Sequence, residues 1–232
     1  MHSKSRTKAI SMCIMNYYHL IILDASGSMD CIRRTAVNGC NETIQTVRNL
    51  QKNHVEDTHY LSLVLFNSDN RTRTLYDCVR ADEIADVPFE DYIPDGCTPL
   101  YDCIGLSVCH LQDQMKKTAS ADKQVLVTII TDGEENSSTL FDARKVKSLV
   151  EEQKHQGWTF VLIGANIDEV LEGDKIGIHN TMAFEQTDRG TRRMAHDYAE
   201  SVKSFCINAP MMNLREKETG FFKKVRKHEC GD

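Results

Sequence analysis

The chain has 232 residues, of which 41% are hydrophobic and 27% are charged. These proportions are typical of a globular protein and exclude a collagen-like rod, a coiled coil and disorder throughout the chain. The formal net charge of −6 disfavours a domain that binds nucleic acid over its whole surface, because such domains are usually basic. At about 150 residues per domain, the length favours one large domain with appendages.

The cysteines and the N-terminal residues bear on the cellular compartment. The nine cysteines include no CxxC pair, and no histidine pair stands nearby at the interval of a zinc site. A chain of this size needs no disulfide staples, so we expect reduced, mostly buried thiols. The apolar run 9–15 is interrupted by polar residues and has no cleavage site after it, unlike a signal peptide. No run reaches the ~20 apolar residues of a membrane span. These features predict a cytoplasmic protein.

Strands and helices are predicted to alternate along the chain. Apolar runs predict strands at 17–23, 60–66, 72–79, 124–131, 158–163 and 181–184. Apolar residues at steps of three and four predict helices around 37–47, 100–115, 146–150 and 194–205. Ser138 or Thr139 is expected to cap the third helix, and Pro210 is expected to end the domain.

This alternation predicts an α/β fold of three layers, a doubly wound and mostly parallel sheet with helices on both faces and one antiparallel edge strand. We expect an N-terminal extension at 1–16, the domain at 17–209 and a basic C-terminal tail at 210–232. In such sheets the functional crevice lies at the carboxyl ends of the strands, where the strand order reverses. The residues that directly follow the strands are therefore the first candidates for a site.

Oxygen-bearing side chains follow two of the predicted strands. Asp24, Ser26 and Ser28 come after the first strand, and Asp132 comes after the strand 124–131. Thr98 stands between them, on a loop that runs into a helix. Two carboxylates and three hydroxyls are hard ligands, which suit magnesium, manganese or calcium better than zinc or copper.

The motif Asp24-x-Ser26-x-Ser28, followed by Thr98 and Asp132-Gly133, resembles the metal-ion-dependent adhesion site of von Willebrand factor type A (VWA) domains. The resemblance covers residues 17–207. The stretches 131–138 and 157–166 look like small stand-alone bacterial members of that family.

The resemblance implies a role for each residue of the motif. The hydroxyls would bind Mg2+ or Mn2+, and the two aspartates would hold the ion directly or through water. An Asp or Glu of a partner protein would complete the octahedron. Partner contacts are expected at Thr98, Gly133 and Glu134. Glu135 is expected either to tune the metal site or to be a solvated acid, Asp102 to be a charge on a helix surface, and His59 to be a solvated histidine.

The resemblance therefore implies an interaction module and not an enzyme, such as an adaptor in a bacterial stress or phage-defence system. No nucleophile elbow and no phosphate loop stands in the sequence. One alternative is a magnesium-dependent phosphohydrolase that uses Asp24 or Asp132. Another is nucleic-acid binding by the tail 210–232, whose net charge is +2 against −8 for the rest of the chain. The tail itself is expected to be frayed and solvated, with a docking peptide as the other possibility.

Overall fold

The computed structural model describes residues 14–68, 71–117, 122–165 and 168–222. Its centre is a six-stranded sheet in the order β3-β2-β1-β4-β5-β6. The strands are β1 (Met15–Asp24), β2 (Thr58–Asn67), β3 (Arg71–Arg80), β4 (Asp122–Thr131), β5 (Thr159–Gly164) and β6 (Asn180–Ala183). All neighbouring strands are parallel except β2 and β3. The predicted α/β class, with its antiparallel edge strand, is confirmed.

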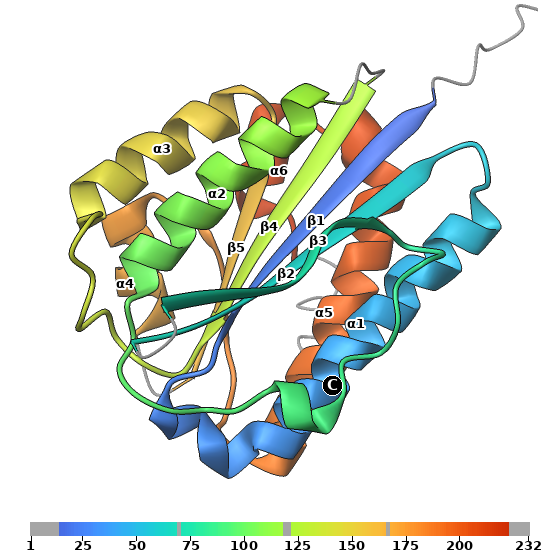
Figure 1. The fold of residues 1–232 in the computed structure, drawn as a ribbon. Helices are drawn as coiled ribbons and strands as arrows, with labels where there is room; N and C mark the ends of the chain where they lie inside the picture. The colour runs from blue at the N-terminus through green and yellow to red at the C-terminus, as the bar shows by residue number, and fades with distance from the viewer. Residues whose placement is uncertain (1–13, 69–70, 118–121, 166–167, 223–232) are drawn as a thin grey trace, which may run out of the picture.

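Helices cover both faces of the sheet (Figure 1). One face carries α1 (Arg33–Asn53) and α5 (Asp188–Asn208), and the other carries α2 (Leu100–Lys117), α3 (Ala143–His155) and α4 (Glu169–Ile176). A short helix, α6 (Leu214–Thr219), follows α5. In the described part of the chain, no helix combines the length and the apolar character needed to cross a membrane.

The central strand β1 is buried on both sides because it lies between two helical layers. Tyr17 and Ile21 pack into the core under α1 and α5, whereas Leu20 and Ile22 pack into the core under α2 and α3. This alternation follows from the two-residue period of a strand. It explains why the sequence of β1 is a continuous apolar run instead of an alternating one.

His59 belongs to this buried sheet, which corrects the expectation that it is solvated. It is only 1% exposed, because β2 begins at Thr58 and places His59 directly beside Tyr17 of β1. Their rings stack with centroids 4.6 Å apart.

The antiparallel edge strand β3 is irregular. Its pairing with β2 shifts register twice, between Leu61 and Val64. Cys78 on the bulged strand has a φ of 50°, and its N–H donates to the hydroxyl of Ser62 at 2.9 Å. Such bulges bend and twist a strand locally.

The C-terminal segment is folded as far as residue 222, so the expected solvated tail is wrong for 210–222. Phe221 and Phe222 are 5% and 3% exposed. The N–H of Phe221 donates to Oδ1 of Asn180 at 3.1 Å, and Nζ of Lys217 donates to Oε1 of Gln124 at 2.6 Å. Burial of two aromatic rings outweighs the polarity of the surrounding residues. The basic residues from Lys223 onward lie outside the described residues, and binding of nucleic acid there stays a prediction.

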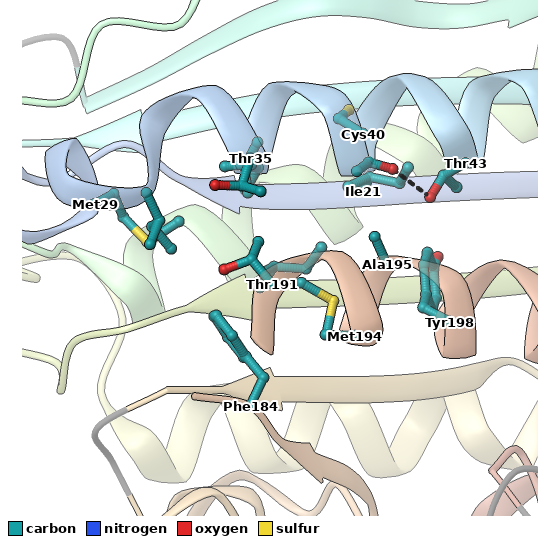
Figure 2. A pocket seen from close by; sticks show the side chains of 15 residues that line it. Ile21, Met29, Thr35, Cys40, Thr43, Phe184, Thr191, Met194, Ala195 and Tyr198 are labelled. Atoms are coloured by element: carbon teal, nitrogen blue, oxygen red, sulfur yellow. Dashed lines mark hydrogen bonds between the residues drawn. The ribbon is translucent and has the colours of Figure 1, made fainter. Parts of the chain in front are cut away.

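A small pocket of about 20 Å3 lies between α1, α5 and the sheet (Figure 2). Its lining is mostly apolar and includes Gly39 of α1 and Ala195 of α5, which lie close together. A methyl group on Gly39 would lie only 2.8 Å from Cβ of Ala195. The hydroxyl of Thr35, which lines the pocket, donates to Oδ1 of Asp188 at 2.7 Å and joins the starts of the two helices.

Candidate metal centre

The predicted site lies where β1 and β4 end side by side. Asp24 is the last residue of β1, and Asp132 directly follows the last residue of β4. The chain leaves β1 toward β2 on one side and leaves β4 toward β5 on the other, so this is where the strand order reverses. The turn after β1 continues as a 3-10 helix, Gly27–Ile32, which places both serines at the rim of the sheet.

The five predicted ligands come together, and hydrogen bonds link four of them. The hydroxyl oxygens of Ser26 and Ser28 are 3.2 Å apart, and Ser28 donates to Oδ1 of Asp132 at 2.7 Å. The N–H of Ser26 donates to Oδ1 of Asp24 at 2.7 Å. Thr131 donates from its hydroxyl to Oδ2 of Asp24 at 2.6 Å, which fixes the orientation of that carboxylate.

Thr98 arrives at the same point from the loop before α2. A methyl group on Gly133 would lie 3.1 Å from the Thr98 hydroxyl, so this hydroxyl lies against the residue that follows Asp132. The backbone of Thr98 is fixed on both sides by Asn136. Its N–H donates to Oδ1 of Asn136 at 2.8 Å, and its carbonyl accepts from the Asn136 N–H at 3.2 Å.

Backbone hydrogen bonds hold the two loops together. The N–H of Gly27 donates to the carbonyl of Gly96 at 3.1 Å, and the N–H of Asp95 donates to the carbonyl of Ala25 at 2.8 Å. Gly96 has a φ of 71°, a backbone conformation that favours glycine. The position of Thr98 relative to the serines therefore depends on main-chain contacts as well as on side chains.

The site carries two buried carboxylates. Asp24 is fully buried and Asp132 is 5% exposed. Burial raises the pKa of Asp24 to about 6, although the hydrogen bonds from Thr131 and Ser26 lower it. Burial likewise raises the pKa of Asp132, against the hydrogen bond from Ser28.

No Lys or Arg of the described residues forms an ion pair with either aspartate. Carboxylates and hydroxyls thus converge at a place with uncompensated negative charge, and this donor set fits a hard divalent cation. Ser28 and Gly27 are exposed, so the site opens to solvent on that side.

Glu134 is exposed, as its expected role as a partner contact requires. Glu135 is not a solvated acid. Its carboxylate accepts from the N–H of Tyr101 at 2.8 Å and from the N–H and hydroxyl of Ser138, both at 2.6 Å. It therefore fastens the first turn of α2 to the loop that follows Asp132.

Asp102 is also buried, at 8% exposure, and not a surface charge. Its Oδ1 accepts from the N–H groups of Leu140 and Phe141 at 2.8 and 2.7 Å, and its Oδ2 accepts from the N–H of Thr139 at 2.9 Å. Neither Ser138 nor Thr139 caps α3, because the helix begins only at Ala143. Asp142 is the cap, and its side chain accepts from the N–H of Lys145 at 2.8 Å.

Gln186 is a site residue that no sequence pattern indicated. It lies between β6 and α5, and its side-chain amide donates to Oδ2 of Asp132 and to the carbonyl of Ser28, the latter at 3.0 Å. No local motif surrounds Gln186, and 54 residues separate it from Asp132. Only the return of the chain along β6 brings the two together.

Comparisons with known proteins agree on the fold. Neither the scan against models of protein families nor the search of curated proteins gives a match. Three of the similar solved structures illustrate the likeness. The PilB minor pilin from Streptococcus sanguinis has a TM-score of 0.54 at 14% identity, over 85% of this chain and 63% of that one. Proximal thread matrix protein 1 from the mussel byssus has zinc in its MIDAS motif, the metal-ion-dependent adhesion site. Its TM-score is 0.56 at 13% sequence identity, over 82% of this chain and 46% of that one.

The SpRpn10 VWA domain scores 0.50 at 13% identity, over 78% of this chain and 94% of that one. The chain thus spans about half to two thirds of the pilin and the matrix protein, and most of the isolated VWA domain. At these identities the likeness concerns the fold alone. The chain has the three-layer fold of VWA domains.

Proposed function

We propose that this chain is a metal-dependent protein interaction module. A divalent cation at the rim of the sheet would be held by Asp24, Ser26, Ser28, Thr98 and Asp132, and it would bind a carboxylate of a partner protein. The observation that carries the proposal is the convergence of two buried carboxylates and their hydroxyl neighbours, with no basic side chain paired to them among the described residues.

The donor set favours Mg2+ or Mn2+. All five donors are oxygens, and magnesium typically binds to one or two carboxylates while keeping open positions for water or another ligand. The mussel matrix protein has zinc in its MIDAS motif, so zinc is the ion to compare. Because three of the five protein ligands would be neutral hydroxyls, the ion would keep a strong affinity for an incoming anion.

The partner would approach over the exposed side of the site, past Gly27, Ser28 and Glu134. An Asp or Glu side chain of the partner would supply an anionic oxygen to the coordination position of the ion that faces solvent, through a charge-assisted contact. No catalytic group stands beside the ion in this proposal, and the chain would act by recruitment. Its placement in bacteria and in a stress or defence system follows from the sequence resemblance, its placement in the cytoplasm follows from the cysteines and the N-terminal residues, and both are part of the proposal.

The first experiment measures metal binding. Mg2+ or Mn2+ at 100 times its dissociation constant should stabilise the fold by about 2.7 kcal/mol. At about 2–4 °C per kcal/mol, this raises Tm by about 5–11 °C. Asp24→Ala should abolish the shift, and Asp30→Ala, which removes an exposed acid of the same turn, should keep it. Equal shifts in wild type and Asp24→Ala would refute the metal site.

The second experiment tests recognition of a carboxylate. Peptides selected from a display library in Mg2+ should bind in Mg2+ and be released by EDTA. Replacing their Asp or Glu by Asn or Gln should weaken binding by about ten- to a hundredfold, the equivalent of one charge-assisted contact of about 1.5–3 kcal/mol. Thr98→Ala should have a similar effect on peptide affinity and a smaller effect on metal affinity. Peptides that bind equally well in EDTA would show that recognition uses another surface.

A further inference from the structure

A second cluster of possible metal ligands lies at the other end of the sheet. His19 of β1, His59 of β2 and Cys206 of α5 each offer one ligand atom, and these three atoms lie within 4.8 Å of one another. All three residues are buried, at 3%, 1% and 6% exposure. Five residues of β1 separate His19 from Asp24, which corresponds to about 16 Å along the strand.

From this cluster, we propose that His19, His59 and Cys206 form a site for a thiophilic metal ion, Zn2+ or Cu+, separate from the rim of the sheet. Nε2 of His19 and Nδ1 of His59 are 3.2 Å apart and share a hydrogen bond, which the metal ion would replace. Around a tetrahedral zinc with Zn–N of about 2.0–2.1 Å and Zn–S of about 2.3 Å, two nitrogens lie about 3.3 Å apart, and a nitrogen and a sulfur about 3.6 Å apart. The two imidazoles are already at this spacing, and the sulfur needs to move by about 1 Å.

The surroundings of the three residues keep them in place. The ring of His59 lies between Tyr17 and His19, with centroid distances of 4.6 and 5.5 Å. The N–H of His59 donates to Oε1 of Gln51 at 2.8 Å, and the hydroxyl of Tyr17 donates to the carbonyl of Cys206 at 2.7 Å. These hydrogen bonds connect β2 to α1 and β1 to α5, and neither of them uses a ligand atom of His19, His59 or Cys206.

The chemistry of the donors selects a different class of ion from the rim. Two imidazoles and one thiolate are preferred by zinc and copper(I), whereas the oxygens around Asp24 are preferred by magnesium and manganese. Binding replaces the proton of the Cys206 thiol by the metal, and the proton leaves to solvent. With one thiolate and two neutral imidazoles, a Cu+ site has no net charge and a Zn2+ site has one positive charge, so burial favours Cu+ electrostatically.

A metal here would connect β1, β2 and the last turn of α5. No carboxylate of the described residues pairs with either imidazole, and all three ligand residues are buried. The ion would have a structural role because it would join three elements of the core, although the three residues leave the fourth position of a tetrahedral zinc without a protein ligand. In sequence, 40 residues separate the two histidines and 147 separate His59 from Cys206, which explains why no local spacing indicates the site.

The test uses the 232-residue chain with the substitution Asp132→Ala, so that the rim does not hold the ion. The protein is first freed of metal and reduced, and Zn2+, Cu+ or Co2+ is then added. We expect one equivalent bound, a thiolate-to-cobalt charge-transfer band, and X-ray absorption with one sulfur and two nitrogens. Cys206→Ser should remove the band and weaken binding more than about 100-fold, because loss of an outer partner alone costs about 10–100-fold. Cys40→Ser, another buried thiol on the same face of the sheet, is the matched control and should change neither.

X-ray absorption of the protein that retains all its cysteines tests whether sulfur binds the metal ion, even if Cys206→Ser fails to fold. A shell without sulfur, no bound equivalent of any of the three ions, or a band that survives in a folded Cys206→Ser protein would overturn the proposal. Affinities for Zn2+ and Cu+ under the same buffer then show which of the two the site prefers. Mg2+ at the same concentration should not displace Zn2+ or Cu+ from this site.

Discussion

Asp102 should contribute strongly to stability although it touches no part of the proposed site. Its carboxylate accepts three backbone N–H groups of the loop 139–141, at 2.7 to 2.9 Å. In Asp102→Asn, one carboxylate oxygen becomes an NH2 group that faces an N–H donor, so at least one charge-assisted bond is lost and its donor is left without a partner. Such a loss costs about 1.5–3 kcal/mol. At about 2–4 °C per kcal/mol, Tm should fall by about 3–12 °C at pH 7.

The pH dependence of this effect has a definite sign. Burial raises the pKa of Asp102, but the N–H groups of Thr139, Phe141 and Leu140 lower it by more, so that the net pKa lies below the ordinary value of 3.8. A carboxylate with a lowered pKa stabilises the fold above its unfolded-state pKa, and the stabilisation is lost as the pH falls through its folded-state pKa. The difference between wild type and Asp102→Asn should therefore be constant from pH 7 to about pH 5 and narrow below about pH 4.

The assay is urea unfolding of both proteins across this pH range. Asp113→Asn is the matched control, because Asp113 lies on the same helix with a side chain that is 69% exposed and paired to Lys116. Its loss should change the free energy of unfolding much less than the loss of Asp102 at any pH, because solvent screens an exposed ion pair. If Asp102→Asn is as mild as Asp113→Asn, or if its effect does not change between pH 5 and pH 3, then the hydrogen bonds to Asp102 do not hold the loop as argued.

Three further outcomes can be checked on the purified protein. Gly39→Ala should lower the free energy of unfolding by up to about 2 kcal/mol, because overpacking against Ala195 costs about 1–3 kcal/mol and the better helix propensity of alanine offsets about 1 kcal/mol. In an Ala195→Gly background, Gly39→Ala should instead stabilise the protein. A loss of equal size in that background would contradict the close approach of α1 and α5. Phe222→Ala should cost about 3–5 kcal/mol in urea unfolding, whereas a change near zero would mean that the segment after α6 does not belong to the core. Nucleotides and simple phosphoesters should not be hydrolysed above background in Mg2+, and turnover that disappears with Asp132→Ala would favour the phosphohydrolase.

The parts of the fold that could be predicted from the sequence are those with a local signal. The continuous apolar run of β1 and the polar residues that follow it are adjacent in the chain, so the sequence alone suffices to assign Asp24 to the end of a strand. The same holds for Asp132 after β4. The parallel pairing of these strands then brings the two aspartates to one rim, because parallel strands end at the same edge.

The features that the sequence did not reveal all depend on contacts between distant segments. Gln186 reaches Asp132 only because the chain returns to the rim along β6. Asp102 looks like a helix-surface charge until the loop 139–141 folds over it. Phe221 and Phe222 stand among basic and polar residues, and composition alone indicates a tail. The partners of Gln186 and Asp102 lie more than 35 residues away, and the ring of Phe221 lies beside Tyr198 and Phe205, 23 and 16 residues away. All of these separations are beyond the reach of helical or strand periodicity.

The irregular strand β3 has a consequence for how the molecule can associate. An exposed, flat edge strand offers its free N–H and C=O groups to the edge of another sheet, which leads to aggregation or to binding of an extended peptide. The two register shifts near Cys78 bend β3 away from a flat edge, and the charged side chains of Arg73, Asp77 and Arg80 lie along it. The edge strand of a second copy of the protein would therefore pair poorly with β3. The irregular shape and the charges of β3 disfavour pairing of any other strand along this edge of the sheet.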